Sequence, residues 1–309
     1  MIYQIRRMIR DDWDEVAELI YRSLNEWYRI HRGIDPFAQS KESMLVFPRV
    51  YESLDPGCCV VATDPESGRI AATSFFHPRP THISLGILNA HPDYWGKGAA
   101  GVVLDEICHI SESEKLPLRL VSSAVNFESF NLYNSRAFVP FAFFQDMSVK
   151  VPESGFEVIP PEGEEMTDAA LSDVAEMADL EYCLCGIRRE SDLRYFVENK
   201  EGIWGMSLSR NLATGRITGF CASVCDPGSN MVGPGCSESE TEAAALIRRE
   251  LNRYPGKSPA WLIPSNALEL RREMFKLGAR NTETHIAQIR GGEAFVKGIL
   301  LPSFMPETC

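Results

Sequence analysis

Apolar residues recur at helical spacing near the start of the chain, and strand-like runs follow them. A predicted helix from near Asp12 to near Tyr28 carries its apolar face at Trp13, Val16, Leu19, Ile20 and Leu24. A short strand precedes this helix, and a second helix is predicted over residues 41–54. Apolar, β-branched runs then predict three strands. The last four elements predicted in the first half of the chain are a helix over residues 98–113, a strand over 118–125, a helix over 127–135 and a strand over 138–151.

The second half repeats this order. A segment rich in Pro, Glu and Gly, residues 151–168, is typical of a linker with an opening strand. Two helices, three strands, a helix, a strand, a helix and a strand are predicted after it. A repeat of this length indicates a duplicated fold. We therefore predict an α/β (α+β) protein with two domains, 1–150 and 151–309, each a mixed, mainly antiparallel sheet flanked by helices.

The segment from Leu88 to Gly101, LNAHPDYWGKGAAG, carries the clearest chemical pattern. A strand ends, and a Gly-Lys-Gly bend opens a helix. The first turn of a helix has free N–H groups and the positive end of its dipole, so it attracts phosphate. Gly96 and Gly98 permit close approach and left-handed backbone angles. The pattern predicts a pyrophosphate cradle, although a tight structural turn would look the same, and it is neither a P-loop nor the dinucleotide fingerprint.

A second motif lies downstream, Asn126-Phe127-Glu128-Ser129-Phe130-Asn131-Leu132-Tyr133-Asn134-Ser135-Arg136-Ala137-Phe138. Together with Ala90-His91-Pro92 and Gly96-Lys97-Gly98-Ala99-Ala100, it resembles the GNAT (Gcn5-related) N-acetyltransferase superfamily over roughly residues 1–150. Two residues depart from the family pattern. Trp95 stands where Gln or Arg is usual, and Ala137 stands where Gly is usual, which would strain the backbone if that position needs a positive φ.

The resemblance implies an N-acetyltransferase that moves acetyl from acetyl-CoA to a primary amine by direct transfer in a ternary complex. Tyr133 would be the catalytic acid that protonates the leaving thiolate. The cofactor-binding residues would be Leu88, Asn89, Ala90, Trp95, Gly96, Lys97, Gly98, Ala99, Ala100, Gly101, Asn126 and Ser129. An acyl-CoA sensor without catalysis and a transferase of another acyl group remain alternatives.

The general base is left open by the sequence. His77 and His82 flank a predicted turn between two strands, and His31 and Asp35 lie near the loop after the first helix. Ser84 lies on the strand that would carry the acetyl site. His91 stands in the motif itself, so its side chain is not expected to be the base.

The second half lacks both chemical features. Its expected loop after residue 232, VGPGCSESE, carries acids and no basic residue, and acids at a helix start repel pyrophosphate. The stretch from Asn266 to Gly278 echoes the one from Asn126 to Ala137, and Met274 stands where the first half has Tyr133. The sequence predicts a retained fold that has lost its cofactor site. The chain thus resembles tandem GNAT proteins, and this resemblance implies a degenerate GNAT-like second domain that shapes the acceptor site.

Charge and composition narrow the partners. The net charge of −12 argues against nucleic acid, and an acidic surface would favour a cationic acceptor such as an amine, although it also serves solubility. We expect a small amine acceptor lying between the domains, with a protein amine as the alternative. No apolar run reaches the roughly 18 residues of a membrane span, and no signal peptide is recognised, so we expect a cytoplasmic protein that does not contact membrane. The nine cysteines do not form a metal-ligand pattern, so no metal is expected. Monomer and homodimer both remain open.

Overall fold

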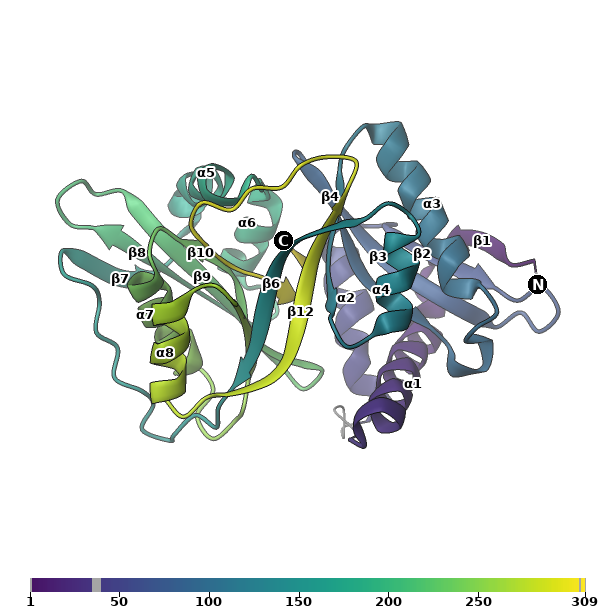
Figure 1. Cartoon of the computed structure of the whole chain (residues 1–309), viewed down its shortest axis with the longest axis horizontal. Coiled ribbons are helices and arrows are strands. Elements are labelled where there is room, and N and C mark those ends of the chain that lie inside the picture. Colours follow the sequence, from purple (N-terminus) through teal and green to yellow (C-terminus); the bar gives the residue numbers. More distant parts are fainter. Residues whose placement is uncertain (1, 35–39, 306, 309) are drawn as a thin grey trace. The chain divides into compact units, whose positions relative to one another are not determined.

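The computed structural model describes residues 2–34, 40–305, 307 and 308, and contacts divide the chain into two compact units. The first unit holds residues 1–78, 83–118 and 226–229, and the second holds residues 79–82, 119–225 and 230–309. The element order follows the predicted repeat (Figure 1). The fold is a mixed α/β architecture whose strands pair mostly antiparallel.

The first unit is built on four strands in the order β1-β2-β3-β4. They are β1 (Gln4–Arg7), β2 (Cys59–Thr63), β3 (Ile70–Arg79) and β4 (His82–Ala90). Its helices are α1 (Trp13–Arg32), α2 (Val46–Leu54) and α3 (Ala99–Glu114). The predicted apolar face of α1 is confirmed, because Val16, Leu19 and Ile20 are buried. The helix expected over 41–54 begins with a 3-10 turn, Lys41–Leu45.

The second unit has the strand order β5-β12-β6-β11-β10-β9-β8-β7. Its strands are β5 (Leu118–Ser123), β6 (Val139–Ser148), β7 (Glu164–Asp168), β8 (Trp204–Asn211), β9 (Ile217–Asp226), β10 (Ser229–Ser237), β11 (Ala260–Pro264) and β12 (Arg280–Arg290), with β13 (Ile299–Leu301), β14 (Ser303–Phe304) and β15 (Glu307–Thr308) in the tail. Its helices are α4 (Phe127–Asn134), α5 (Val174–Cys185), α6 (Glu190–Glu198), α7 (Glu240–Leu251) and α8 (Leu268–Lys276).

The two halves of the sequence exchange their last strands inside the second unit. β12 lies between β5 and β6, and β6 lies between β12 and β11. β6 and β12 pair antiparallel from Val139–Ile289 to Ser148–Arg280, and Figure 1 shows them as adjacent teal and yellow strands. Residues 119–150 therefore cluster with the second half, so the contact boundary does not fall at residue 150.

The core of the second unit lies under α7 and α8. Buried residues of α7 pack with Leu270 and Met274 of α8 onto strand residues such as Trp261, Ile263 and Met147. This apolar packing is what holds the β11–β6 region of the sheet. The eight cysteines among the described residues are free thiols. Of the helices in the described ranges, none is both long and apolar enough to cross a bilayer.

Candidate functional site

The predicted cradle forms at the end of β4 in the first unit. β4 ends at Ala90, and the His91 N–H then donates to the Ala71 carbonyl on β3 at 2.9 Å. A single 3-10 turn, Pro92–Tyr94, leads into the bend. Gly96 and Gly98 have φ of 71° and 85°, the left-handed region that the sequence analysis associated with glycine. The bend therefore has the predicted backbone geometry.

The start of α3 presents free donors. Gly98 is the N-cap and supplies no side-chain acceptor, and the first helical bond runs from Val102 N–H to the Gly98 carbonyl. The N–H groups of Ala99, Ala100 and Gly101 precede that bond, so they belong to the unpaired first turn of the helix. A Cβ added at Gly96 or Gly98 would meet no described atom within 4 Å. The space in front of the loop is open, and the residues fit a pyrophosphate.

Lys97 and Trp95 take roles that the motif did not specify. The Lys97 ammonium donates to the Asp93 carbonyl at 2.7 Å and lies 5.6 Å from the Tyr94 ring centre. Its charge is therefore held at the base of the loop. The Trp95 indole N–H donates to the Ala90 carbonyl at 2.8 Å. Trp95 thus fixes the end of β4, where the family's usual polar residue would be.

Leu88 and Asn89 precede Ala90 on β4 and are also expected to contact the cofactor arm. Leu88 is half-buried, whereas Asn89 is 4% exposed. The side-chain amide nitrogen of Asn89 finds no acceptor among the described residues. An unpaired buried donor is costly, so it marks a position where a ligand group would be favoured.

His91 is a structural residue of this corner. Its Nε2 lies 3.1 Å from a guanidinium nitrogen of Arg22 and 3.1 Å from one of Arg69. Burial lowers the pKa of His91, and the charges of Arg69 and Arg22 lower it further. The charge of Asp93 raises the pKa but does not outweigh these effects. A neutral ring held between two cations cannot readily gain a proton, which agrees with the expectation that His91 is not the base.

The second motif forms α4 in the second unit. Asn126 is its N-cap, and the Asn126 Oδ1 accepts the Ser129 N–H at 3.0 Å, so this pair orders the helix start. Tyr133 is 7% exposed and packs edge-on against Phe138 with ring centres 5.7 Å apart. Ala137 has a φ of 63°. The strain predicted for this departure from the family pattern is therefore present.

The candidate bases lie in very different surroundings. His31 is exposed and stacks on Trp27 with ring centres 4.5 Å apart, while His82 is buried with its Nδ1 2.9 Å from the Thr81 hydroxyl. Ser84 is buried on β4. Asp35 lies outside the described residues. His77 is buried with its Nδ1 2.6 Å from the Asp55 carboxylate, a partner for which the sequence carries no local signal.

The second half closes the equivalent helix start with its own side chains. Ser239 is the N-cap of α7, and its hydroxyl accepts the Glu242 N–H at 3.2 Å. The Glu242 carboxylate in turn accepts the N–H of Glu238, the residue just before the N-cap, at 3.2 Å. Glu238 pairs with Arg216 at 2.6 Å. The donors that Gly98 leaves open in the first half are thus partly satisfied here.

The stretch expected to be a loop in the second half is a strand. β10 continues to Ser237, because Gly235, Cys236 and Ser237 pair with Leu301, Leu300 and Ile299 of β13. β10 pairs with β11 at Met231 and Val232, and further along β10 its partner is the tail strand β13. The tail passes so close at Gly298 that a Cβ there would lie 2.5 Å from the Ser237 carbonyl.

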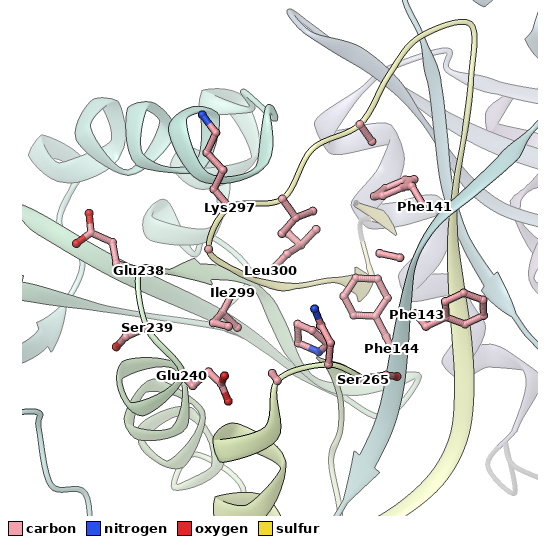
Figure 2. Close-up of a pocket in the computed structure, with 17 residues that line it drawn as sticks. Phe141, Phe143, Phe144, Glu238, Ser239, Glu240, Ser265, Lys297, Ile299 and Leu300 are labelled. Carbon is pink, nitrogen blue, oxygen red and sulfur yellow. The ribbon is translucent and has the colours of Figure 1, made fainter.

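A cavity of about 1000 Å³ remains beside the tail strand in the second unit. Figure 2 shows Phe141 and Phe144 of β6 on one side, Glu240 at the start of α7 on the other, and Ile299 and Leu300 of the tail between them. The Glu240 carboxylate accepts the Leu270 N–H at 2.8 Å, so it also caps α8. In the described ranges, no three His, Cys, Asp or Glu side chains gather as a metal site.

The echo between α4 and α8 holds at their C-terminal ends but starts one residue later than expected. Ala279 N–H bonds to the Met274 carbonyl as Phe138 N–H bonds to that of Tyr133, and Gly278 has a φ of 85°. Met274 therefore occupies the Tyr133 position, as predicted. The N-cap of α8 is Ala267, with φ −78° and ψ 87° against −90° and 84° for Asn126. Ala267, rather than Asn266, matches Asn126.

Comparison with known proteins agrees with this architecture. Residues 18–138 match the sequence family described as the acetyltransferase (GNAT) family. The structure of a putative acetyltransferase from Pyrococcus horikoshii has a TM-score of 0.73 at 14% identity, over 98% of this chain and 95% of that one. A GCN5-related N-acetyltransferase from Sphaerobacter thermophilus gives 0.64 at 17% identity, over 93% and 95%.

A tandem GNAT protein from the clavulanic acid biosynthesis pathway gives a TM-score of 0.58 at 12% identity, over 94% of this chain and 99% of that one. No curated protein sequence matches the chain. At these identities the solved structures establish the fold, while the sequence match covers the part that contains both motifs. Residues 18–138 thus match the GNAT acetyltransferase family, and the chain shares its fold with solved GNAT structures, one of them a tandem GNAT protein.

Proposed function

We propose that this protein transfers an acetyl group from acetyl-CoA to a primary amine by direct transfer in a ternary complex. The GNAT fold supports acyl transfer in general. The observation that carries the finer proposal is the loop from Gly96 to Gly101. Its two left-handed glycines lead into the first turn of α3, which has no side-chain cap, and a Cβ added at either glycine would meet no described atom within 4 Å.

The roles of the residues follow from donors and acceptors. The N–H groups of Ala99, Ala100 and Gly101 would bind the pyrophosphate of acetyl-CoA. The edge of β4 from Leu88 to Ala90 would bind the pantetheine arm, with the Ala90 carbonyl already engaged by Trp95. When bound, acetyl-CoA supplies an activated thioester. A backbone N–H on this strand would stabilise the oxygen of the thioester carbonyl as negative charge develops on it.

Transfer itself needs proton movements at two atoms and no covalent enzyme intermediate. The acceptor nitrogen must lose one proton to become a nucleophile and a second as the amide forms, and the thiolate of CoA must gain one. We assign the protonation of the thiolate to Tyr133, which lies on α4, is 7% exposed and packs beside Phe138. Asn126 and Ser129 order the start of that helix, which supports their role at the cofactor arm.

The acceptor is proposed to be a small, cationic amine, with a protein amine as the alternative. The net charge of −12 favours a cation over an anion. The second half is proposed to shape the acceptor site. Two observations support this: β12 lies beside β5, and the side chains of Ser239 and Glu242 accept N–H groups at the second half's own helix start.

The first test is acetyl-CoA binding by titration calorimetry, with native protein and Gly98→Glu. A carboxylate at the N-cap of α3 would repel the pyrophosphate, and we expect at least a tenfold loss of affinity, about 1.4 kcal/mol. Gly68→Glu is the matched control, since Gly68 also has a left-handed φ, 73°, and an open Cβ direction. It should bind as the native protein does. Absence of binding by the native protein would refute the proposal.

The second test separates an enzyme from a sensor and identifies the acyl group. Tyr133→Phe should keep acetyl-CoA affinity within about twofold while transfer to an amine falls by 10²-fold or more, in the range of general acid catalysis. A panel of acyl-CoAs with native protein tests whether acetyl is preferred. Unchanged transfer in Tyr133→Phe would contradict the role given to the phenol, and binding without transfer to any amine would favour the sensor.

A further inference from the structure

His77 combines burial, orientation and an unused nitrogen. It lies on β3 and is 1% exposed, and its Nδ1 is 2.6 Å from the Asp55 carboxylate at the C-cap of α2. Its ring packs at 4.7 Å on the Tyr51 ring. Asp55 and Tyr51 from α2 and Gly86 from β4 therefore lie against the ring.

The other ring nitrogen, Nε2, is buried and has no hydrogen-bond partner among the described residues. Because Asp55 accepts at Nδ1, the proton of the neutral ring sits there and Nε2 keeps its lone pair. Leaving such an acceptor unpaired costs about 1–3 kcal/mol. A histidine that a carboxylate holds in this tautomer is arranged to accept a proton at Nε2.

Nε2 lies close to β4, the strand expected to hold the acetyl group. A Cβ added at Gly86 would lie 3.1 Å from Nε2 and 3.0 Å from the Phe75 Cβ, so the ring rests against β4 at its glycine. Gly86 and Leu88 face the same side of the strand, and one such step is about 7 Å. One or two waters would be needed to span that distance.

We propose that His77 takes up the proton that the acceptor amine loses, by way of water along β4 between Gly86 and Leu88, and that Asp55 is its positioning residue. This inference rests on the proposed transfer reaction. An ammonium acceptor gives one proton to Nε2, and His77 later releases it to solvent. The second proton leaves nitrogen as the C–N bond forms and the C–S bond breaks, and it restores Tyr133, which has protonated the thiolate.

The test compares three variants with native protein in steady-state kinetics and calorimetry. His77→Gln should lower kcat by about 10²-fold or more, the range of general base catalysis, while acetyl-CoA affinity stays within about twofold. The rise of kcat/KM with pH should flatten in this variant. Asp55→Asn should lower kcat less than His77→Gln does, because the imidazole ring remains. It should also shift the pH at which kcat/KM rises, because the tautomer of the ring is no longer fixed.

His285→Gln is the matched control. His285 is also buried, and its Nδ1 is also 2.6 Å from a carboxylate, that of Asp146. It should retain the native pH profile. If His77→Gln misfolds, as judged by circular dichroism and thermal unfolding, Asp55→Asn decides, because its side chain is 12% exposed at the end of a helix. An Asp55→Asn profile that superposes on the native one would then overturn the inference.

Two further outcomes are distinguishable. A folded His77→Gln that turns over as native protein does, or a profile lost only in His285→Gln, overturns the role of His77 and leaves the transfer reaction standing. Native protein that binds acetyl-CoA but acetylates no amine refutes the proposed function and the role of His77 with it, because no acceptor proton then needs to be removed.

Discussion

Ala137→Gly should stabilise the protein, because Ala137 occupies a backbone position suited to glycine. It ends α4 with a φ of 63°, and its N–H donates to the Asn134 carbonyl at 3.0 Å. The second half has the same turn at the end of α8, where Gly278 has a φ of 85° and its N–H donates to the Phe275 carbonyl at 3.0 Å. Both positions are exposed, so packing contributes little to the difference.

The magnitude follows from two opposing terms. A left-handed φ costs a residue with a Cβ roughly 1–2 kcal/mol, whereas glycine loses about 0.4–1 kcal/mol more on folding because its unfolded chain is freer. The net gain expected for Ala137→Gly is about 0.5–1 kcal/mol, or roughly 2 °C in the unfolding midpoint of a chain of this size. Gly278→Ala should change stability by a similar amount in the opposite direction, since its added Cβ would meet no described atom within 4 Å.

The assay is urea unfolding followed by circular dichroism and tryptophan fluorescence, with calorimetry for the midpoint. Opposite signs for the two substitutions would support the backbone argument. If Ala137→Gly lowers the midpoint, or if Gly278→Ala leaves it unchanged, the assignment of strain to the left-handed conformation is wrong. Acetyl transfer should be retained in Ala137→Gly, because the turn and the hydrogen bond from Phe138 N–H to the Tyr133 carbonyl are kept.

Two other predictions concern charge and the tail. Burial opposes ionisation of Asp12, but hydrogen bonds from Arg6 and from the Ile9 N–H outweigh it and hold the pKa of Asp12 below its ordinary value. Asp12→Asn should therefore cost about 1 kcal/mol of unfolding free energy at neutral pH. This difference from native protein should begin to shrink near pH 3.9, where Asp12 of the unfolded chain gains its proton, and should vanish below the lower pKa of the folded protein; a constant difference down to pH 2 would contradict this. Native protein should bind one acetyl-CoA per chain, and Gly298→Val, which forces the tail away from the Ser237 carbonyl, should lower stability without adding a second site; a stoichiometry near two would refute the closed second half.

The sequence alone determined the features that depend on neighbouring residues. The glycines at 96 and 98, the start of α3 just after them, the apolar face of α1 and the strained turn at Ala137 were all predictable, because each is fixed by local backbone conformation or by helical spacing. The repeated order of elements was predictable for the same reason. These features were enough to indicate the family and the position of the cofactor loop.

Tertiary structure decided the features that join distant segments. Gly233 to Ser237 reads locally as a loop, yet it is a strand because β13, more than 60 residues later, supplies its hydrogen bonds. The exchange of β6 and β12 and the pairing of His77 with Asp55 across 22 residues leave no local signal either. The edge of a strand can pair with the backbone of any sequence, and a histidine N–H can donate to any carboxylate that lies close enough. Which strand and which carboxylate become the partners is therefore decided by the tertiary structure.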